Sequence, residues 1–241
     1  MASRFRIRTT IGQPAIPAAS KSQKRVAFLA MVTEGDVEEP QYLMYVIGMC
    51  QRKYRTVVDI RIVNDELPPH VAKVGSNPLV RLNYLIKWLE LNAPDYNPQL
   101  QDTAWLVCDR DDGSFSVRQY NLVMKLCESR DIHFIISNPA FQLWLLLHYT
   151  SAINVKLLNC YPRSKGKLIQ IEKMLTTYVP SYRHGEINMD DFKILIDAAV
   201  QNNQQLPSNP SLLKRTVGSN FYLLMEYFKV VFGFQSFTDV I

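Results

Sequence analysis

Three acidic residues follow strand-like apolar runs and could together bind a divalent cation. Glu34 follows the first such run, and Asp109 and Asp111 follow another run farther along the chain. In an extended chain, residues two positions apart point to the same side, so Asp109 and Asp111 would face one ion while Asp112 turns aside. Hard carboxylate oxygens suit Mg²⁺ or Mn²⁺ rather than Zn²⁺. Such an ion binds phosphates, orients a water molecule and stabilises the charge that develops on a phosphate under attack.

The segments that would position these carboxylates alternate between strands and helices. We predict strands at 26–32, 57–63, 104–108 and 132–136, and helices at 38–53, 79–92, 116–130 and 139–148. This alternation is typical of βαβ units and a parallel sheet. Open parallel sheets bind ligands beyond the carboxyl ends of their strands. If the first and third strands are neighbours, the three carboxylates converge at that edge.

The second part of the chain has a different pattern. The strand signal fades after about Ser151, and we predict helices at 165–178, 189–203 and 210–232. The sequence therefore predicts an α/β protein with an open, mostly parallel sheet flanked by helices, followed by a helical C-terminal part. The predicted divisions are a disordered basic leader at 1–24, an α/β catalytic domain at 25–150 and a helical region at 151–241 that packs on it.

The formal net charge of +5 is concentrated near the N-terminus. The first 25 residues contain no acid and carry Arg4, Arg6, Arg8, Lys21, Lys24 and Arg25. A basic arm can neutralise phosphates and add salt-dependent affinity for nucleic acid, although a solvated tail has the same composition. No apolar run approaches the length of a membrane span, and widely spaced cysteines suit reduced thiols. We therefore expect a soluble, cytoplasmic protein.

Each acidic motif also has a plainer interpretation. Asp111 and Asp112 are typical of a solvated surface turn. Glu34 also suits a strand-to-helix turn in which Asp36 caps the following helix. The occurrence of both motifs directly after buried strands favours the metal site.

Two groups of residues resemble known families. Thr33-Glu34-Gly35 and Cys108-Asp109-Arg110-Asp111-Asp112 resemble the two halves of the Toprim signature, a Glu after the first strand and an Asp-x-Asp after the third. The run Ser137–Tyr149, SNPAFQLWLLLHY, is similar to the signature run of RloB-like proteins, which are Toprim proteins often associated with restriction-modification and phage-defence loci. The resemblance spans about Lys24 to Tyr149 and continues more weakly at Asn209-Pro210-Ser211 and in the final helix.

The resemblance implies a Toprim nuclease fold and a set of site residues. Glu34 would act as general acid/base or metal ligand, and Asp109 and Asp111 as metal ligands. Glu38 matches a further family acid, although an exposed Glu in the first helical turn is also favoured by the helix dipole. The family usually has Glu where this chain has Gln142. Gln142 would then contact the metal ligands without binding the metal itself, or activity would be reduced.

Further residues could bind the substrate. His148 could donate a hydrogen bond to a phosphate or assist proton transfer, although a histidine near a helix end is often a structural group. A basic stretch could follow a nucleic-acid backbone, although a solvated helical face would have the same composition. It consists of Lys156, Arg163, Lys165, Lys167 and Lys173.

These observations favour a Mg²⁺- or Mn²⁺-dependent endonuclease that hydrolyses RNA, including tRNA, or DNA in antiviral defence. The alternative from another class is a catalytically weakened or partner-activated effector that keeps the Toprim fold and binds nucleic acid or a signalling ligand. A nucleotide-binding enzyme ranks third, because no GxGxxG or Walker loop follows the first strand. A defence-system partner, an activating ligand and a homo-oligomer all stay open.

Overall fold

The computed structural model describes most of the chain after the N-terminal leader. The described residues are 27–54, 58–68, 75–92, 102–110, 113, 115–152, 154 and 165–241, with side chains of the helix at 165–178 described from residue 170 onward. The predicted leader at 1–24 lies outside them, as do Asp111, Asp112, Lys156 and Arg163. Lys165 and Lys167 lie in a described helix, but their side chains are outside the described part.

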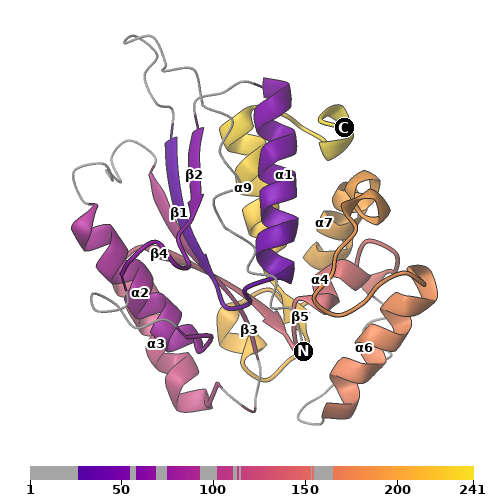
Figure 1. Cartoon of the computed structure of the whole chain (residues 1–241). Coiled ribbons are helices and arrows are strands. Elements are labelled where there is room, and N and C mark those ends of the chain that lie inside the picture. Colours follow the sequence, from indigo (N-terminus) through magenta and orange to yellow (C-terminus); the bar gives the residue numbers. More distant parts are fainter. Residues whose placement is uncertain are drawn as a thin grey trace, which may run out of the picture.

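A five-stranded sheet forms the centre of the molecule (Figure 1). Its strands are β1 (Ala27–Thr33), β2 (Val58–Ile62), β3 (Thr103–Asp109), β4 (Ile132–Asn138) and β5 (Gly218–Ser219), in the order β2-β1-β3-β4-β5. The first four strands are parallel, and β5 is antiparallel to β4. The predicted mostly parallel α/β sheet is confirmed, and β1 and β3 are neighbours as the site requires.

Helices and short 3₁₀ turns surround the sheet. The longer elements are α1 (Glu38–Tyr54), α2 (Pro78–Leu91), α3 (Val117–Ser129), α6 (Lys165–Tyr178), α7 (Ile196–Gln204) and α9 (Tyr222–Phe232). The shorter elements are α4 (Gln142–Leu146), α8 (Pro210–Leu213), η2 (Met189–Asp191), η3 (Lys193–Leu195) and η4 (Phe237–Asp239). None of the described helices is long and apolar enough to cross a bilayer.

Side chains of the parallel strands alternate between two cores, because successive residues of a strand face opposite sides. Phe28, Ala30 and Val32 pack with α2 and α3, whereas Leu29 and Met31 pack with α1, α4, α7 and α9. Figure 1 shows α2 and α3 on one face and α1 and α9 on the other. Since β1 is buried along its whole length, its continuous apolar sequence is the pattern expected of a central strand in a parallel sheet.

Three predicted helices have different bounds in the structure. The predicted helix at 139–148 is shorter, and that at 189–203 is divided into η2, η3 and α7. The continuous helix predicted at 210–232 is wrong, because β5 lies between α8 and α9.

Tertiary contacts hold β5 in place. A side chain at Gly218 would collide with the Pro207 carbonyl. The side chain of Asn220 bonds the backbone of β4, accepting from the Ile136 N–H and donating to the Phe134 carbonyl. These tertiary contacts, which helical periodicity does not reveal, attach the C-terminal region to the sheet.

Candidate active site at the carboxyl ends of β1 and β3

The structure brings Glu34 and Asp109 together at the edge of the sheet. The backbone N–H of Glu34 donates to the Val107 carbonyl over 2.9 Å, which extends the pairing of β1 with β3 by one residue. The Glu34 carboxylate then accepts from the backbone N–H of Asp109, also over 2.9 Å. Both acids are half-buried. Two of the three predicted metal ligands therefore meet where the sheet topology places a ligand.

A polar network fixes the turn that carries Glu34. Asn64, which follows β2, accepts from the backbone N–H of Thr33 and donates to its hydroxyl group. Arg81 of α2 is fully buried and donates to the Asp36 carboxylate and to the backbone carbonyls of Glu34 and Asn64. The turn is therefore held from β2 and α2 at once. Preorganisation of this kind keeps a site in its productive geometry.

A further carboxylate, that of Glu39, lies against this turn. Glu39 is 5% exposed at the start of α1. A Cβ at Gly35 would overlap the position of the Glu39 carboxylate, which shows that this carboxylate packs directly against the turn. The charge of Glu39 raises the pKa of Asp109 more than the charges of Glu34 and Glu38 do. Glu39 therefore belongs to the same cluster as Glu34 and Asp109.

Burial and mutual repulsion oppose the ionisation of the carboxyl groups in this cluster. Burial raises the pKa of Asp109 well above its ordinary value, and the charges of Glu39 and Glu34 raise it further. Burial also raises the pKa of Glu39 to about 7, with added repulsion from Glu38 and Asp36. Buried carboxylates that raise one another's pKa are typical of functional sites, where a bound cation or a reacting proton relieves the repulsion.

The residue between the two predicted Asp ligands points away from the cluster. Arg110 is 2% exposed, donates to the carbonyls of Phe115 and Lys214, and contacts the rings of Phe115 and Tyr120. This orientation agrees with the alternation expected at positions 109–111. Asp111 itself is outside the described residues. Among the residues that are described, no group of three or more His, Cys, Asp or Glu side chains is arranged to hold a metal ion.

Glu38, which the sequence suggests as a catalytic acid, has a different environment. It is 5% exposed, and one carboxylate oxygen accepts from the Tyr182 hydroxyl and from the backbone N–H of Gly185, each over 2.8 Å. Its other oxygen accepts from the side-chain amide of Gln142. The structure thus uses Glu38 to attach the segment after α6 to the start of α1, and Glu39 rather than Glu38 lies beside Asp109.

Gln142 supports Glu38 from α4. Its amide nitrogen donates to Glu38, and its buried carbonyl oxygen has no hydrogen-bond partner among the described residues. A Glu at this position would place a second buried carboxylate against Glu38, and the pair would repel unless a proton or a cation lay between them. The amide of Gln142 removes that repulsion.

His148 is placed in the core, apart from the carboxylates. It is 3% exposed, its Nε2 lies 3.1 Å from the Tyr42 hydroxyl, and its Nδ1 lies 3.1 Å from the Trp144 carbonyl. Rings of Tyr42, Trp144 and Phe192 surround it. Burial lowers the pKa of His148 to about 4. Because both ring nitrogens already have hydrogen-bond partners, His148 is not available to contact a substrate in this structure.

The environment of His148 predicts a dependence of stability on pH. The unfolded chain binds a proton at this histidine below about pH 6.5, whereas the folded protein does so only below about pH 4. Stability is therefore lost as pH falls from 6.5 to 4, by about 3 kcal/mol from this group. We expect His148→Gln to reduce the difference in unfolding free energy between pH 7 and pH 4.5, measured by urea denaturation. An unchanged pH dependence in the variant would contradict the buried, neutral histidine.

The predicted basic stretch is only partly described. Lys156 and Arg163 fall outside the described residues, and Lys165 and Lys167 are described only as backbone of α6. Lys173 lies exposed on the same helix. The nucleic-acid contacts predicted for these residues therefore stay predictions.

Several residues of the site are absent from the sequence-based prediction. Glu39 is next to Glu38, and spacing alone does not show which of two adjacent acids faces the sheet. Arg81 interrupts the apolar face of an amphipathic helix. A charged residue at a position where the pattern predicts burial is a sequence signal of a buried polar network, and Arg81 is buried in the structure. Asn64 and Tyr182 contribute through tertiary contacts that the sequence does not show.

Fold and site together define an α/β protein with an acidic cluster at the carboxyl ends of its central strands. The family model described as RloB-like protein matches residues 29–228. The chain therefore belongs to the RloB-like family. Searches among curated proteins and among solved structures gave no match.

Proposed function

We propose that this protein is a Mg²⁺- or Mn²⁺-dependent nuclease with a Toprim-type domain. One observation carries the proposal: Glu34 and Glu39 converge with Asp109 at the carboxyl ends of β1 and β3, where burial, with the charges of Glu39 and Glu34, raises the pKa of Asp109. Membership of the RloB-like family also supports this proposal. The substrate we propose is nucleic acid, with tRNA as the first RNA to test, and the setting is antiviral defence in the cytoplasm.

The donor set fits a hard divalent cation. Glu34 and Asp109 supply carboxylate oxygens, and Asp111 would complete the set from the segment after β3. Mg²⁺ and Mn²⁺ prefer oxygen ligands, and a positive charge here would offset the mutual repulsion of the carboxylates. When bound, the cation would stabilise negative charge on the phosphate.

Glu39 is the residue best placed to handle a proton. Its pKa, raised to about 7, allows the carboxylate to accept a proton from an attacking water near neutral pH. Its low exposure keeps bulk water from competing for that proton. Glu39 therefore takes the general-base role, while Glu38 fixes the neighbouring segment in place.

A cleavage assay tests the proposal. Purified protein is incubated with total tRNA, single-stranded DNA and duplex DNA in Mn²⁺, Mg²⁺ or EDTA, beside Glu34→Gln. We expect cleavage of at least one substrate that requires the metal and falls by at least about 10³-fold in the variant, because charge stabilisation at the phosphate is lost. Glu90→Gln, which changes an exposed carboxylate paired with Lys87 on the outer face of α2, is the matched control and should keep full activity.

The second candidate is a partner-activated effector on the same fold. It is favoured by Gln142, an amide at the position where the resemblance to the family leads one to expect an acid, whose side chain donates to Glu38. Clear Mn²⁺ binding without cleavage would favour this candidate. Absence of both Mn²⁺ binding and cleavage would contradict the nuclease.

A further inference from the structure

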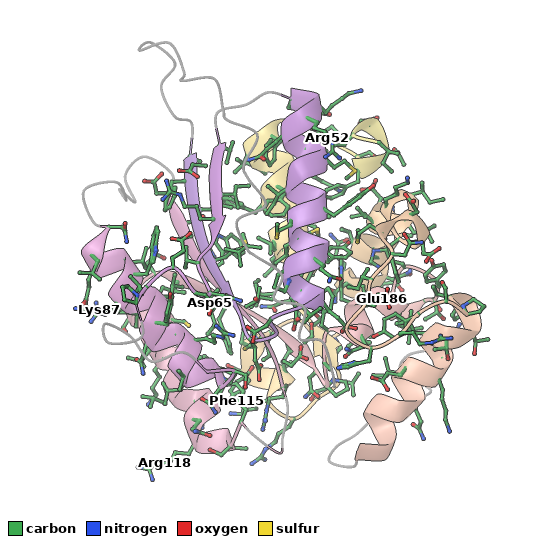
Figure 2. All side chains as sticks on the ribbon, viewed as in Figure 1. Arg52, Asp65, Lys87, Phe115, Arg118 and Glu186 are labelled. Carbon is green, nitrogen blue, oxygen red and sulfur yellow. The ribbon has the colours of Figure 1, made fainter. Side chains whose placement is uncertain are left out.

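A short loop presents an exposed imidazole beside the acidic cluster. His184 lies at the tip of a turn in which the Glu186 N–H donates to the Arg183 carbonyl, and Gly185 adopts a positive φ of 83°. Its side chain is 67% exposed, in contrast to the buried His148. Figure 2 shows this loop, marked by Glu186, beside the N-terminal end of α1. The turn therefore holds an imidazole outward, next to the helix end that carries Glu39.

Hydrogen bonds attach this loop to the site. Tyr182 and Gly185, on either side of His184, both donate to the same oxygen of Glu38, which is adjacent to Glu39 in α1. Glu38 is itself fixed by Gln142. Because two donors from one loop converge on a buried carboxylate, the position of His184 relative to the cluster is set by the fold rather than by a free surface loop.

The His184 ring also has an orienting partner. Its Nδ1 lies 3.3 Å from the Glu172 carboxylate on α6 and 3.9 Å from Glu38. Nδ1 also lies 3.3 Å from the side-chain amide nitrogen of Gln142, so a carboxylate and an amide together restrict the orientation of the ring. The other nitrogen, Nε2, has no hydrogen bond to any described residue, and the side chain that carries it is largely exposed. His184 also interacts electrostatically with Glu39.

We infer that His184 is a catalytic general acid of the proposed nuclease and that Glu172 positions it; the inference rests on the proposed function. In the step, the oxygen of a water molecule forms a bond to phosphorus while its proton passes to Glu39. The bond from phosphorus to the leaving oxygen breaks, and the proton on Nε2 of His184 passes to that oxygen. Solvent then returns a proton to His184 and removes the one on Glu39, so no other reactant is required.

The test compares two substrates in Mn²⁺. In an oligonucleotide the leaving alkoxide needs a proton, whereas bis(p-nitrophenyl) phosphate releases a phenolate that does not. We expect His184→Gln to lower kcat on the oligonucleotide by about 10²-fold or more, to leave KM nearly unchanged, and to alter cleavage of bis(p-nitrophenyl) phosphate less than about threefold. Glu172→Gln should show the same selectivity with a smaller loss. His133→Gln is the control, since His133 stacks on Trp105 at the start of β4, at the opposite end of the strands.

The outcomes separate the inference from the proposed function. An active wild type with equal losses on both substrates, or with no loss on either, would overturn the role of His184 alone. A wild type inactive on both substrates would overturn the nuclease and the acid role with it. A second readout is independent of turnover: an uncleavable phosphorothioate oligonucleotide bound in Ca²⁺ should protect His184, but not His133, from diethyl pyrocarbonate. Bound oligonucleotide without such protection would also overturn the inference.

Discussion

Asp109→Asn is expected to abolish metal-dependent cleavage and, in the same molecule, to raise thermal stability. Activity should fall by at least about 10³-fold, because a neutral amide oxygen is a weak ligand and cannot supply the charge that holds the cation. Stability should rise because burial and the neighbouring charges of Glu39 and Glu34 oppose ionisation of Asp109. The amide removes that repulsion and can still accept from the backbone N–H of Phe141, which donates to the carboxylate of Asp109. Each kcal/mol gained corresponds to about 2–4 °C in Tm for a chain of this size.

Melting curves in EDTA at pH 8, read beside cleavage in Mn²⁺, check both parts. Asp59→Asn is the matched control on β2 of the same sheet, since Asp59 forms a partly exposed pair with Arg61. That control should change Tm by no more than about 2 °C and leave activity intact. A variant at Asp109 that melts lower than the wild type in EDTA would show that the carboxylate stabilises the fold, and would contradict the electrostatic account of the cluster.

Arg81→Met is expected to produce the largest loss of stability among the polar positions of the site. The guanidinium group is 1% exposed and bonds Asp36 and two backbone carbonyls, those of Glu34 and Asn64. Methionine keeps much of the apolar stem but leaves these acceptors without their donor. We expect a loss of about 2–4 kcal/mol, seen as a fall in Tm of roughly 5–15 °C, and weaker Mn²⁺ binding because the Glu34 turn is released.

Two variants bracket this effect. Arg81→Lys keeps the charge but lacks the planar fork that reaches three acceptors, so it should recover only part of the lost stability. Lys87, on the outer face of the same helix (Figure 2), pairs with the exposed Glu90, so Lys87→Met should change stability by less than about 0.5 kcal/mol. Equal Tm values for Arg81→Met and Lys87→Met would show that the buried network does not hold the turn.

The sheet could be predicted from sequence because its signals are local. The part of β1 before Thr33 is continuously apolar, and β1 lies between two other strands, so its burial on both faces and its sequence agree. The capping box of α3, in which Ser116 and Gln119 bond each other, is also local and marks the start of that helix. In contrast, β5 has only two residues, and the contacts of Gly218 and Asn220 that create it come from distant segments.

The part of the site that lies at the ends of strands could be predicted from the sequence. Glu34 and Asp109 follow buried strands, and the neighbouring positions of those strands bring them together. Glu38 and Glu39 are adjacent, and their roles are separated only by the packing of Gly35 and by the loop at Gly185. His184 lies far from the motifs in sequence and joins the site through Tyr182 and Glu38. No spacing rule predicts such a contact, because it depends on how α6 and the following loop pack.

Crystals grown with Mn²⁺ test the central claim most directly, through anomalous diffraction at the manganese absorption edge. We predict a single strong peak at the carboxyl ends of β1 and β3, bound by oxygens of Glu34, Asp109 and Asp111, and lost in crystals of Asp109→Asn. A peak at another position, or none at saturating Mn²⁺, would contradict a metal site built on these carboxylates and with it the nuclease that we propose.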